Sequence, residues 1–296
     1  MTEEGRSYLY AGLAVFFWST IATAFKLALA QLSVVQLLFI SSATSVFVLL
    51  IISILEGNLK ELLKIDTTSI FRSTGLAFLN PLIYYLVLLK AYTLLPAQVA
   101  QPLNMIWPIV LVFLSVPLLN QKIPARSFVA LFISFIGVYL ISSQGNPLRP
   151  GASDLLGILL AAGSSIFWAL YFIYNLKDKR PESVKLFFNF LIATIILTIY
   201  IAFSGGFSAI SLKGAVAGIY VGIFEMGFTF YLWLKALRLA SASDKISNLV
   251  FLAPFLSLLF ISIFLNEHIY LTTPSGLLFI IGGIIYMNSG KKRYVS

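Results

Sequence analysis

Long apolar runs dominate this chain, and short polar stretches separate them. Ten runs are each long enough to cross a hydrocarbon core about 30 Å thick, which takes roughly 17 to 25 helical residues. They cover residues 8–30, 33–55, 70–92, 96–119, 125–143, 154–176, 183–203, 213–237, 243–265 and 271–288. Polar and apolar positions do not alternate along them, as β-barrel strands would require. Because backbone groups in lipid need internal hydrogen bonds, the pattern predicts an all-α polytopic membrane protein with ten transmembrane helices.

Composition strengthens this prediction. Only 10% of the residues are charged and 59% are hydrophobic, whereas soluble domains carry roughly a quarter charged residues. The net charge of +9 does not point to nucleic acid, because basic residues collect in the cytoplasmic loops of membrane proteins. The chain has no cysteine, which excludes disulfides, thiolate metal sites and a cysteine nucleophile. We therefore expect no metal, no cofactor and no nucleic-acid partner.

The basic residues also predict an orientation. With the N-terminus inside, 16 of the 20 Lys and Arg residues fall on the cytoplasmic side of the ten predicted helices. The four on the outer side are Lys26, Lys90, Arg149 and Lys213. Both termini should therefore be cytoplasmic, in an integral plasma (inner) membrane protein. The dense basic cluster at 177–185 fits either contact with anionic lipid or a simple determinant of topology.

A repeat divides the chain into two halves at an offset of about 145 to 150 residues. The matched pairs are Phe17-Trp18 with Phe167-Trp168, Leu89-Lys90-Ala91 with Leu234-Lys235-Ala236, Pro108 with Pro254, and Gly137 with Gly283. We expect a first repeat at 1–145, a linker at 146–153 and a second repeat at 154–296. Because each repeat holds five helices, the second should lie inverted relative to the first, as in transporters that move around a midplane site.

Glu225 is the one acid that falls deep inside a predicted span. A carboxylate facing lipid costs between about 2.5 and more than 10 kcal/mol, so such residues usually face a cavity or a partner. Its repeat counterpart at offset 145 is Asn80. The functional interpretation is a proton carrier or an anchor for a substrate amine. The structural alternative is a protonated acid that is hydrogen-bonded to a neighbouring helix.

Polar residues in other spans are further candidates for a binding site. Span 96–119 carries Gln98, Gln101 and Asn104 beside two prolines, which remove backbone donors and free carbonyl groups. These amides could line a site or accompany a packing kink. Lys26 could meet a substrate carboxylate, pair with Glu225 or extend to the outer interface.

Aromatic residues supply candidate walls for a cavity, since they suit amphipathic or cationic ligands. Core packing is the alternative for each of them. With the polar candidates, the predicted substrate site comprises Trp18, Lys26, Asn80, Tyr84, Gln98, Gln101, Asn104, Trp107, Trp168, Tyr171, Glu225, Phe228, Tyr231 and Asn248.

Several short motifs together resemble the EamA type of the drug/metabolite transporter superfamily over nearly the whole chain. They are Trp18-Ser19-Thr20, Lys26, Gly227, Tyr231, Trp233, Ala236-Leu237, Leu252-Ala253-Pro254 and Leu265-Asn266-Glu267. The resemblance implies a ten-helix fold. In it, helices one, three, four, six, eight and nine surround a central cavity, and helices five and ten are peripheral. Asn104, Trp107-Pro108 and the Trp18 motif resemble the aromatic amino acid exporter branch. Glu225 departs from the common family pattern.

Enzyme classes fit poorly. The HExxH zinc motif is absent, only one acid lies at midplane, and the single histidine, His268, falls at a helix end. We therefore predict no catalytic residues and a secondary active exporter of small amphipathic metabolites, with amino acids leading and Glu225 as the candidate proton-coupling residue. The alternatives are an uncoupled facilitator or exchanger for metabolites or cationic drugs, or a lipid-handling protein. Expected partners are the bilayer, a small-molecule substrate and protons, and a homodimer is left open.

Overall fold

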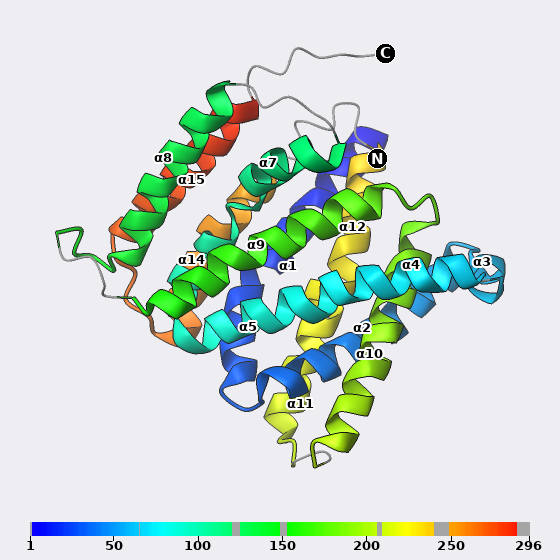
Figure 1. Ribbon diagram of the computed structural model, residues 1–296. Coiled ribbons are helices and arrows are strands. Elements are labelled where there is room, and N and C mark those ends of the chain that lie inside the picture. The colour runs from blue at the N-terminus through cyan, green and yellow to red at the C-terminus, as the bar shows by residue number, and fades with distance from the viewer. Residues whose placement is uncertain are drawn as a thin grey trace.

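The structure, a computed structural model, describes residues 2–64, 66–119, 125–148, 153–205, 209–239 and 249–288. Every regular element in these ranges is a helix, so the all-α class is confirmed. Figure 1 shows long helices packed side by side, with the N-terminus beside α12 (Phe228–Leu239). The predicted site residue Asn248 and part of the predicted linker, 149–152, lie outside the described residues.

The helices follow the predicted spans closely. They are α1 (Glu3–Leu29), α2 (Val34–Leu55), α3 (Leu59–Leu63), α4 (Thr67–Ala77), η1 (Phe78–Ile83), α5 (Tyr84–Leu94), α6 (Ala97–Asn104), α7 (Trp107–Leu119), α8 (Ala125–Ser142), α9 (Leu155–Leu176), α10 (Glu182–Phe203), α11 (Leu212–Val221), η2 (Gly222–Gly227), α12, η3 (Leu249–Phe251), α14 (Leu252–Leu265) and α15 (Thr272–Asn288).

Eight helical stretches in the described part are long and apolar enough to cross a membrane. Two further apolar stretches, Leu249–Leu265 and Thr272–Met287, fall below 18 residues. They coincide with the predicted ninth and tenth spans. The chain is therefore a multi-pass membrane protein, and the count of ten crossings stays a prediction.

Two spans contain a π-helical segment, where the backbone makes a wider turn with one extra residue. The segment η1 includes Asn80, whose φ of −148° and ψ of 120° interrupt the helix just before Pro81. The segment η2 contains Glu225. Asn80 and Glu225 are the counterparts that the repeat predicted, so both halves carry an irregular segment at the matched position, although η1 is kinked at Asn80 and η2 is not. Such π turns are frequent at functional sites.

A third interruption divides the span that contains the three amides. The helix α6 ends at Asn104, and α7 begins at Trp107. Pro102 lies one turn before the break, and its carbonyl accepts the Met105 N–H at 3.1 Å in the tighter turn that ends α6. The kink that the prolines predicted therefore lies at residues 105–106, deep in the span.

The helices α8 and α15 pack against each other at one side of the molecule, away from the main bundle in Figure 1. A Cβ atom on Gly137 would lie 2.5 Å from the Gly276 carbonyl, and one on Gly276 would lie 2.5 Å from the Gly137 carbonyl. A Cβ atom on Gly283 would lie 2.9 Å from the Ala130 carbonyl. Residue 130 therefore faces 283 and residue 137 faces 276, which makes the two helices antiparallel.

Glycines also bring α11 and η2 close to α2. A Cβ atom on Gly222 would lie 2.5 Å from the Thr44 Cβ and 2.6 Å from the Ser41 carbonyl. The Ser45 hydroxyl donates a hydrogen bond of 2.8 Å to the Gly222 carbonyl at the same contact. Small residues permit such close approach between membrane helices. This contact fixes the turn that carries Glu225.

We expect Gly222→Ala to destabilise the protein by about 1–3 kcal/mol, because the added methyl group overlaps the α2 backbone, which cannot move independently. Thermal unfolding in detergent checks this prediction. Gly163→Ala is the matched control, since a Cβ atom there meets nothing within 4 Å. Equal melting temperatures for the two variants would contradict the close contact.

Candidate functional site

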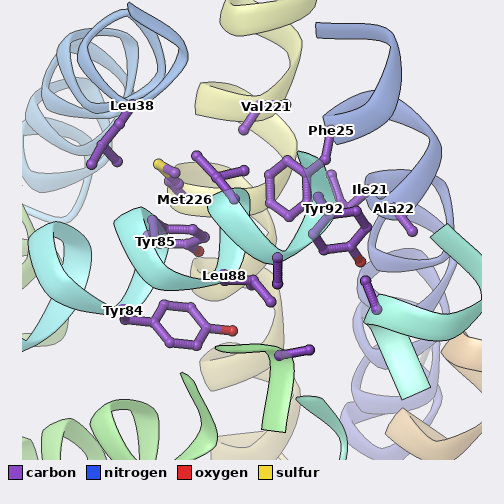
Figure 2. Close-up of a cluster of buried hydrophobic side chains, with 14 of the residues drawn as sticks. Ile21, Ala22, Phe25, Leu38, Tyr84, Tyr85, Leu88, Tyr92, Val221 and Met226 are labelled. Carbon is purple, nitrogen blue, oxygen red and sulfur yellow. The ribbon is translucent and has the colours of Figure 1, made fainter. Parts of the chain in front are cut away.

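Glu225 lies at the contact between the two halves of the chain. Its Oε1 accepts a hydrogen bond of 2.9 Å from the Tyr85 hydroxyl on α5. Figure 2 shows Tyr85 beside Met226, within a buried group that also includes Phe25 and Tyr92. Tyr85 and Met226 are fully buried, whereas the Glu225 side chain keeps some accessible surface. Among the described residues, Tyr85 supplies the one hydrogen bond that holds the carboxyl group.

Polar side chains continue from Tyr85 across the first half. The neighbouring Tyr84 ring lies 4.7 Å from the Tyr85 ring, and its hydroxyl donates a hydrogen bond of 3.2 Å to Asn104 Oδ1. Asn104 Nδ2 donates to the Ser164 hydroxyl on α9 at 2.7 Å. The break between α6 and α7 thus places Asn104 between helices of both halves.

A second group of amides lies around Tyr171 on α9. Its hydroxyl accepts a hydrogen bond of 3.4 Å from Asn189 Nδ2 and also interacts with the Asn80 side chain. Asn80 Oδ1, Asn189 Oδ1 and Gln101 Oε1 are all buried and make no hydrogen bond to the described residues. A buried acceptor without a donor is costly, so these oxygen atoms are candidate acceptors for a donor that the described residues do not supply.

Aromatic rings connect these polar groups. The Trp168 ring lies 4.9 Å from Tyr84, 5.9 Å from Tyr171 and 5.5 Å from Phe230. Phe230 in turn lies 5.8 Å from Trp18. The structure therefore brings together seven of the predicted site residues, namely Trp18, Asn80, Tyr84, Asn104, Trp168, Tyr171 and Glu225. We call these seven residues with Tyr85 the central cluster.

Two predicted site residues, Lys26 and Gln98, lie instead at helix ends that the predicted orientation puts outside. Lys26 Nζ donates to the carbonyls of Tyr92 and Leu95, both at 2.9 Å, at the C-terminal end of α5. A cation is favourable there because the last carbonyls of a helix have no partner within it. The Gln98 side chain donates to the His268 carbonyl at 2.7 Å and lies 3.1 Å from the Thr273 hydroxyl. Neither side chain reaches Glu225.

Sequence reasoning missed the role of Glu267. Its two carboxylate oxygens accept hydrogen bonds from the backbone N–H groups of Ala97 and Gln98, at 2.9 and 3.2 Å. These groups begin α6, so Glu267 from the second half caps a helix of the first half. The side chains of Lys26 and Gln98 complete a set of contacts that we call the outer closure. A capping role could not be found from the sequence, since 170 residues separate the partners.

The remaining predicted residues have other neighbours. The Trp107 ring lies 5.9 Å from Phe172, and the Phe228 ring lies 6.4 Å from Phe17. The Tyr231 hydroxyl accepts a hydrogen bond of 2.5 Å from Lys235 Nζ one turn later on α12. Gln101 is buried one turn before Asn104. These side chains pack around the central cluster or lie beyond it.

A cavity of about 360 Å³ lies near Tyr231. It is lined by the end of α2, residues 179–186 and α12. The predicted orientation puts these segments at the cytoplasmic ends of their helices, and we call this space the inner cavity. Its lining includes Lys179 and Arg180 from the basic cluster at 177–185, for which the sequence left open a lipid contact or a topology determinant.

That cluster is an ordered ionic network. Arg180 Nη2 lies 2.6 Å from Asp178 Oδ2 and donates to the Ser73 hydroxyl at 2.8 Å. Lys185, which is 1% exposed, pairs with Glu182 at 2.6 Å. Burial alone would raise the pKa of Asp178, but the hydrogen bonds from Arg180 outweigh it and hold that pKa below its usual value. The segment therefore ties α4, α9 and α10 together.

We expect Asp178→Asn to lower the free energy of unfolding by about 1–3 kcal/mol at pH 7. The pKa of Asp178 is lower in the folded state than in the unfolded state, where it is near 3.8. The stability that Asp178 contributes is therefore present above pH 3.8 and is lost as the pH falls through the pKa of the folded state. The difference between variant and wild type should therefore shrink below pH 3.8. Melting temperatures across pH measure this, with Glu61→Gln on the exposed α3 as control. A constant difference at all pH values would rule out the ionic contribution.

Comparison with known proteins assigns the chain. The EamA-like transporter family matches residues 5–143 and again residues 155–289. This chain belongs to that family. The two matches cover one half each, and the EamA-like fold is built from two such repeats. Family membership identifies the chain as a multi-pass membrane transporter and not as an enzyme.

Relatives support the same assignment for this EamA-like chain. It is 26% identical over 97% of its length to the uncharacterized transporter YvbV of Bacillus subtilis, of which it covers 93%. It is also 26% identical, over 92% of its length, to an uncharacterized transporter of Archaeoglobus fulgidus, of which it covers 94%. It is 25% identical to protein PecM of Dickeya dadantii over 73% of each chain.

The fold agrees with experiment as well. One solved crystal structure superposes on 98% of this EamA-like chain with a TM-score of 0.67, at 19% sequence identity, and 99% of that chain is covered. At this level of identity the similarity supports the arrangement of the helices alone.

Proposed function

We propose that this EamA-like transporter is a secondary active exporter of small amphipathic metabolites that carry an amine, with amino acids as the leading class. The observation that carries this proposal is the composition of the central cluster. The Glu225 carboxyl group and the Asn80 amide oxygen lie among aromatic rings, and the Asn189 amide oxygen lies beside Tyr171; neither amide oxygen has a donor among the described residues. A ligand that supplies hydrogen-bond donors would satisfy these oxygen atoms.

An ammonium group fits this chemistry. It carries three donors, it pairs with a carboxylate, and its positive charge is attracted to the faces of aromatic rings. Trp168 and Tyr84 provide such faces beside Asn104. An aromatic or apolar side chain of the substrate would pack on the Trp18 and Phe230 rings. Glu225 serves as the anchor for the amine or as the carrier of the coupled proton.

Alternating access is the proposed mechanism. The outer closure joins the ends of α1, α5 and α6 to the segment before α15, while the inner cavity opens between α2, α10 and α12. A molecule closed at one end and hollow at the other suits a transporter in its inward-facing state. Inward and outward states would exchange when the outer closure breaks and the walls of the inner cavity approach each other.

Inverted repeats relate the inward-facing and outward-facing states by a pseudo-twofold axis, so these two states would have similar free energies. The α8–α15 contact supports inversion, because its helices are antiparallel and its contacts are reciprocal. Gly137 meets Gly276 and Ile280, and the equivalent Gly283 meets the equivalent positions Ala130 and Ser134. We extend this to ten helices in two inverted sets of five around the central cluster, with both termini cytoplasmic in the plasma membrane.

Flux in proteoliposomes tests the proposal. Radiolabelled amino acids would be measured against a panel of cationic drugs and of the same amino acids blocked as N-acetyl derivatives. Accumulation that depends on a proton gradient and is lost on N-acetylation supports the proposal. Transport of N-acetylated compounds as fast as the free amines would refute the amine site. Flux that only equilibrates would favour the facilitator or exchanger alternative.

A further inference from the structure

The inner cavity contains positive charge that the ionic network does not neutralise. Arg180 is paired with Asp178, and Lys185 is paired with Glu182. Lys179 and Lys235 also line the cavity, and neither forms an ion pair with any described residue. Both lysines are open to solvent or to a ligand.

One further acid borders the cavity but is already engaged. Glu56 Oε2 accepts hydrogen bonds from Ser183 at 2.8 Å and from Asn58 at 3.3 Å. It attracts Lys235 electrostatically without reaching ion-pair distance. After the paired charges are set aside, the two lysines face this single carboxylate, so the lining keeps a net positive charge.

Unpaired hydrogen-bond donors belong to residues that line the same cavity. Arg180 Nη1 is buried and has no hydrogen-bond partner within the described ranges. The helix α10, which is 22 residues long, begins at the cavity after Pro181, and no side chain caps its first N–H groups. A helix N-terminus carries partial positive charge, and uncapped N–H groups there bind anions. Lys235 Nζ donates one hydrogen bond, to Tyr231, and keeps two donors for a ligand.

We propose that the inner cavity is a binding site for an oxyanion group, a carboxylate or a phosphate, held by Lys235, Lys179 and the start of α10. The central cluster offers a carboxyl group and an unpaired amide oxygen, whereas this cavity offers charged donors. A zwitterion that approaches from the cytoplasm would place its carboxylate here before its amine reaches Glu225. The site does not depend on amino acid export, since the headgroup of an anionic lipid has the same chemistry.

Ligand-induced stabilisation of the whole purified chain in neutral detergent tests the site. Benzoate and inorganic phosphate probe soluble anions, and phosphatidylglycerol against phosphatidylcholine in mixed micelles probes a lipid source. Ionic strength is held constant with sodium chloride. We expect a saturable rise in melting temperature with at least one of these oxyanion probes, because binding to the folded state stabilises it.

Variants locate the effect. Lys235→Gln should weaken the apparent affinity for the effective probe by about tenfold or more, since it removes a charged hydrogen bond. Lys235→Arg should retain most of it. Lys90→Gln is the matched control, because Lys90 occupies the equivalent Leu-Lys-Ala motif of the first half, is exposed and does not line the cavity. Lys179→Gln is a second variant in case Lys235→Gln folds poorly.

The outcomes separate clearly. Stabilisation by benzoate or phosphate that depends on Lys235 supports a site for a soluble anion, and stabilisation by phosphatidylglycerol alone supports a lipid headgroup site. No saturable shift with any probe, or an equal loss in the Lys90 and Lys235 variants, would overturn the inference. Failure here would leave amine export intact, and failure of amine export in the flux assay would leave this site intact.

Discussion

Replacing Glu225 by Gln should abolish transport that is driven by a proton gradient. The change is nearly isosteric, so Tyr85 and the α2 contact can remain in place. Gln carries no exchangeable charge, and it cannot form an ion pair with an amine. We expect accumulation in proteoliposomes to fall to the level of protein-free liposomes.

A second measurement separates the two roles proposed for Glu225. Counterflow exchange of substrate across the membrane needs binding but no net proton movement. If Glu225 only carries protons, Glu225→Gln keeps exchange and loses accumulation; if it anchors the amine, both are lost. Tyr85→Phe is the control, since it removes the hydrogen bond but keeps the carboxyl group. Full, pH-dependent accumulation by Glu225→Gln would eliminate both roles.

Replacing Glu267 by Gln should open the outer end of the transporter. The change removes the negative charge and one of the two oxygen acceptors that bind the backbone N–H groups of Ala97 and Gln98. The new amide NH2 group is itself a donor and cannot accept a hydrogen bond from these N–H groups. Loss of such charged hydrogen bonds costs about 1–3 kcal/mol, which corresponds to about 5- to 150-fold in the ratio of closed to open molecules. The cap is therefore expected to set how long the outer end stays closed.

Labelling of a single cysteine measures this opening. The natural chain has no cysteine, so Ala100→Cys, at a buried position one turn into α6, gives a unique reporter. A membrane-impermeant maleimide added outside should react about tenfold faster when Glu267→Gln is also present. His268→Gln is the control, because Gln98 bonds the backbone of His268 and not its side chain. Unchanged labelling would mean that Glu267 does not hold the outer end closed.

The transmembrane pattern could be predicted because each span meets the same physical requirement independently of the others. A segment that leaves water must be apolar and must satisfy its own backbone, so the helix bounds follow from local sequence. The repeat could also be used, since it related Asn80 to Glu225 before any contact was known. The structure places an irregular turn at each of these residues.

Contacts between distant segments were beyond sequence reasoning. Nothing local distinguishes Gln98, which bonds the segment before α15, from Asn104, which joins the central cluster two turns later. Lys26 had several plausible partners in sequence, and its actual partners are backbone carbonyls that every residue possesses. The position of a polar residue in a span could thus be predicted, whereas its partner could not.

The two π-helical segments have a further consequence for the phase of their helices. Each residue of an α-helix advances by about 100°, so one extra residue turns everything beyond it by about that angle. Tyr231 and Lys235 lie beyond η2 and reach the inner cavity with this added rotation. A helical wheel that continues through Glu225 at 100° per residue, without the extra residue, therefore places the side chains of α12 on the wrong face of the helix. Deleting one residue from Gly222–Gly227 would rotate α12 back and carry Lys235 off the cavity wall. The chain length between Glu225 and Lys235 therefore specifies which side of α12 faces the inner cavity.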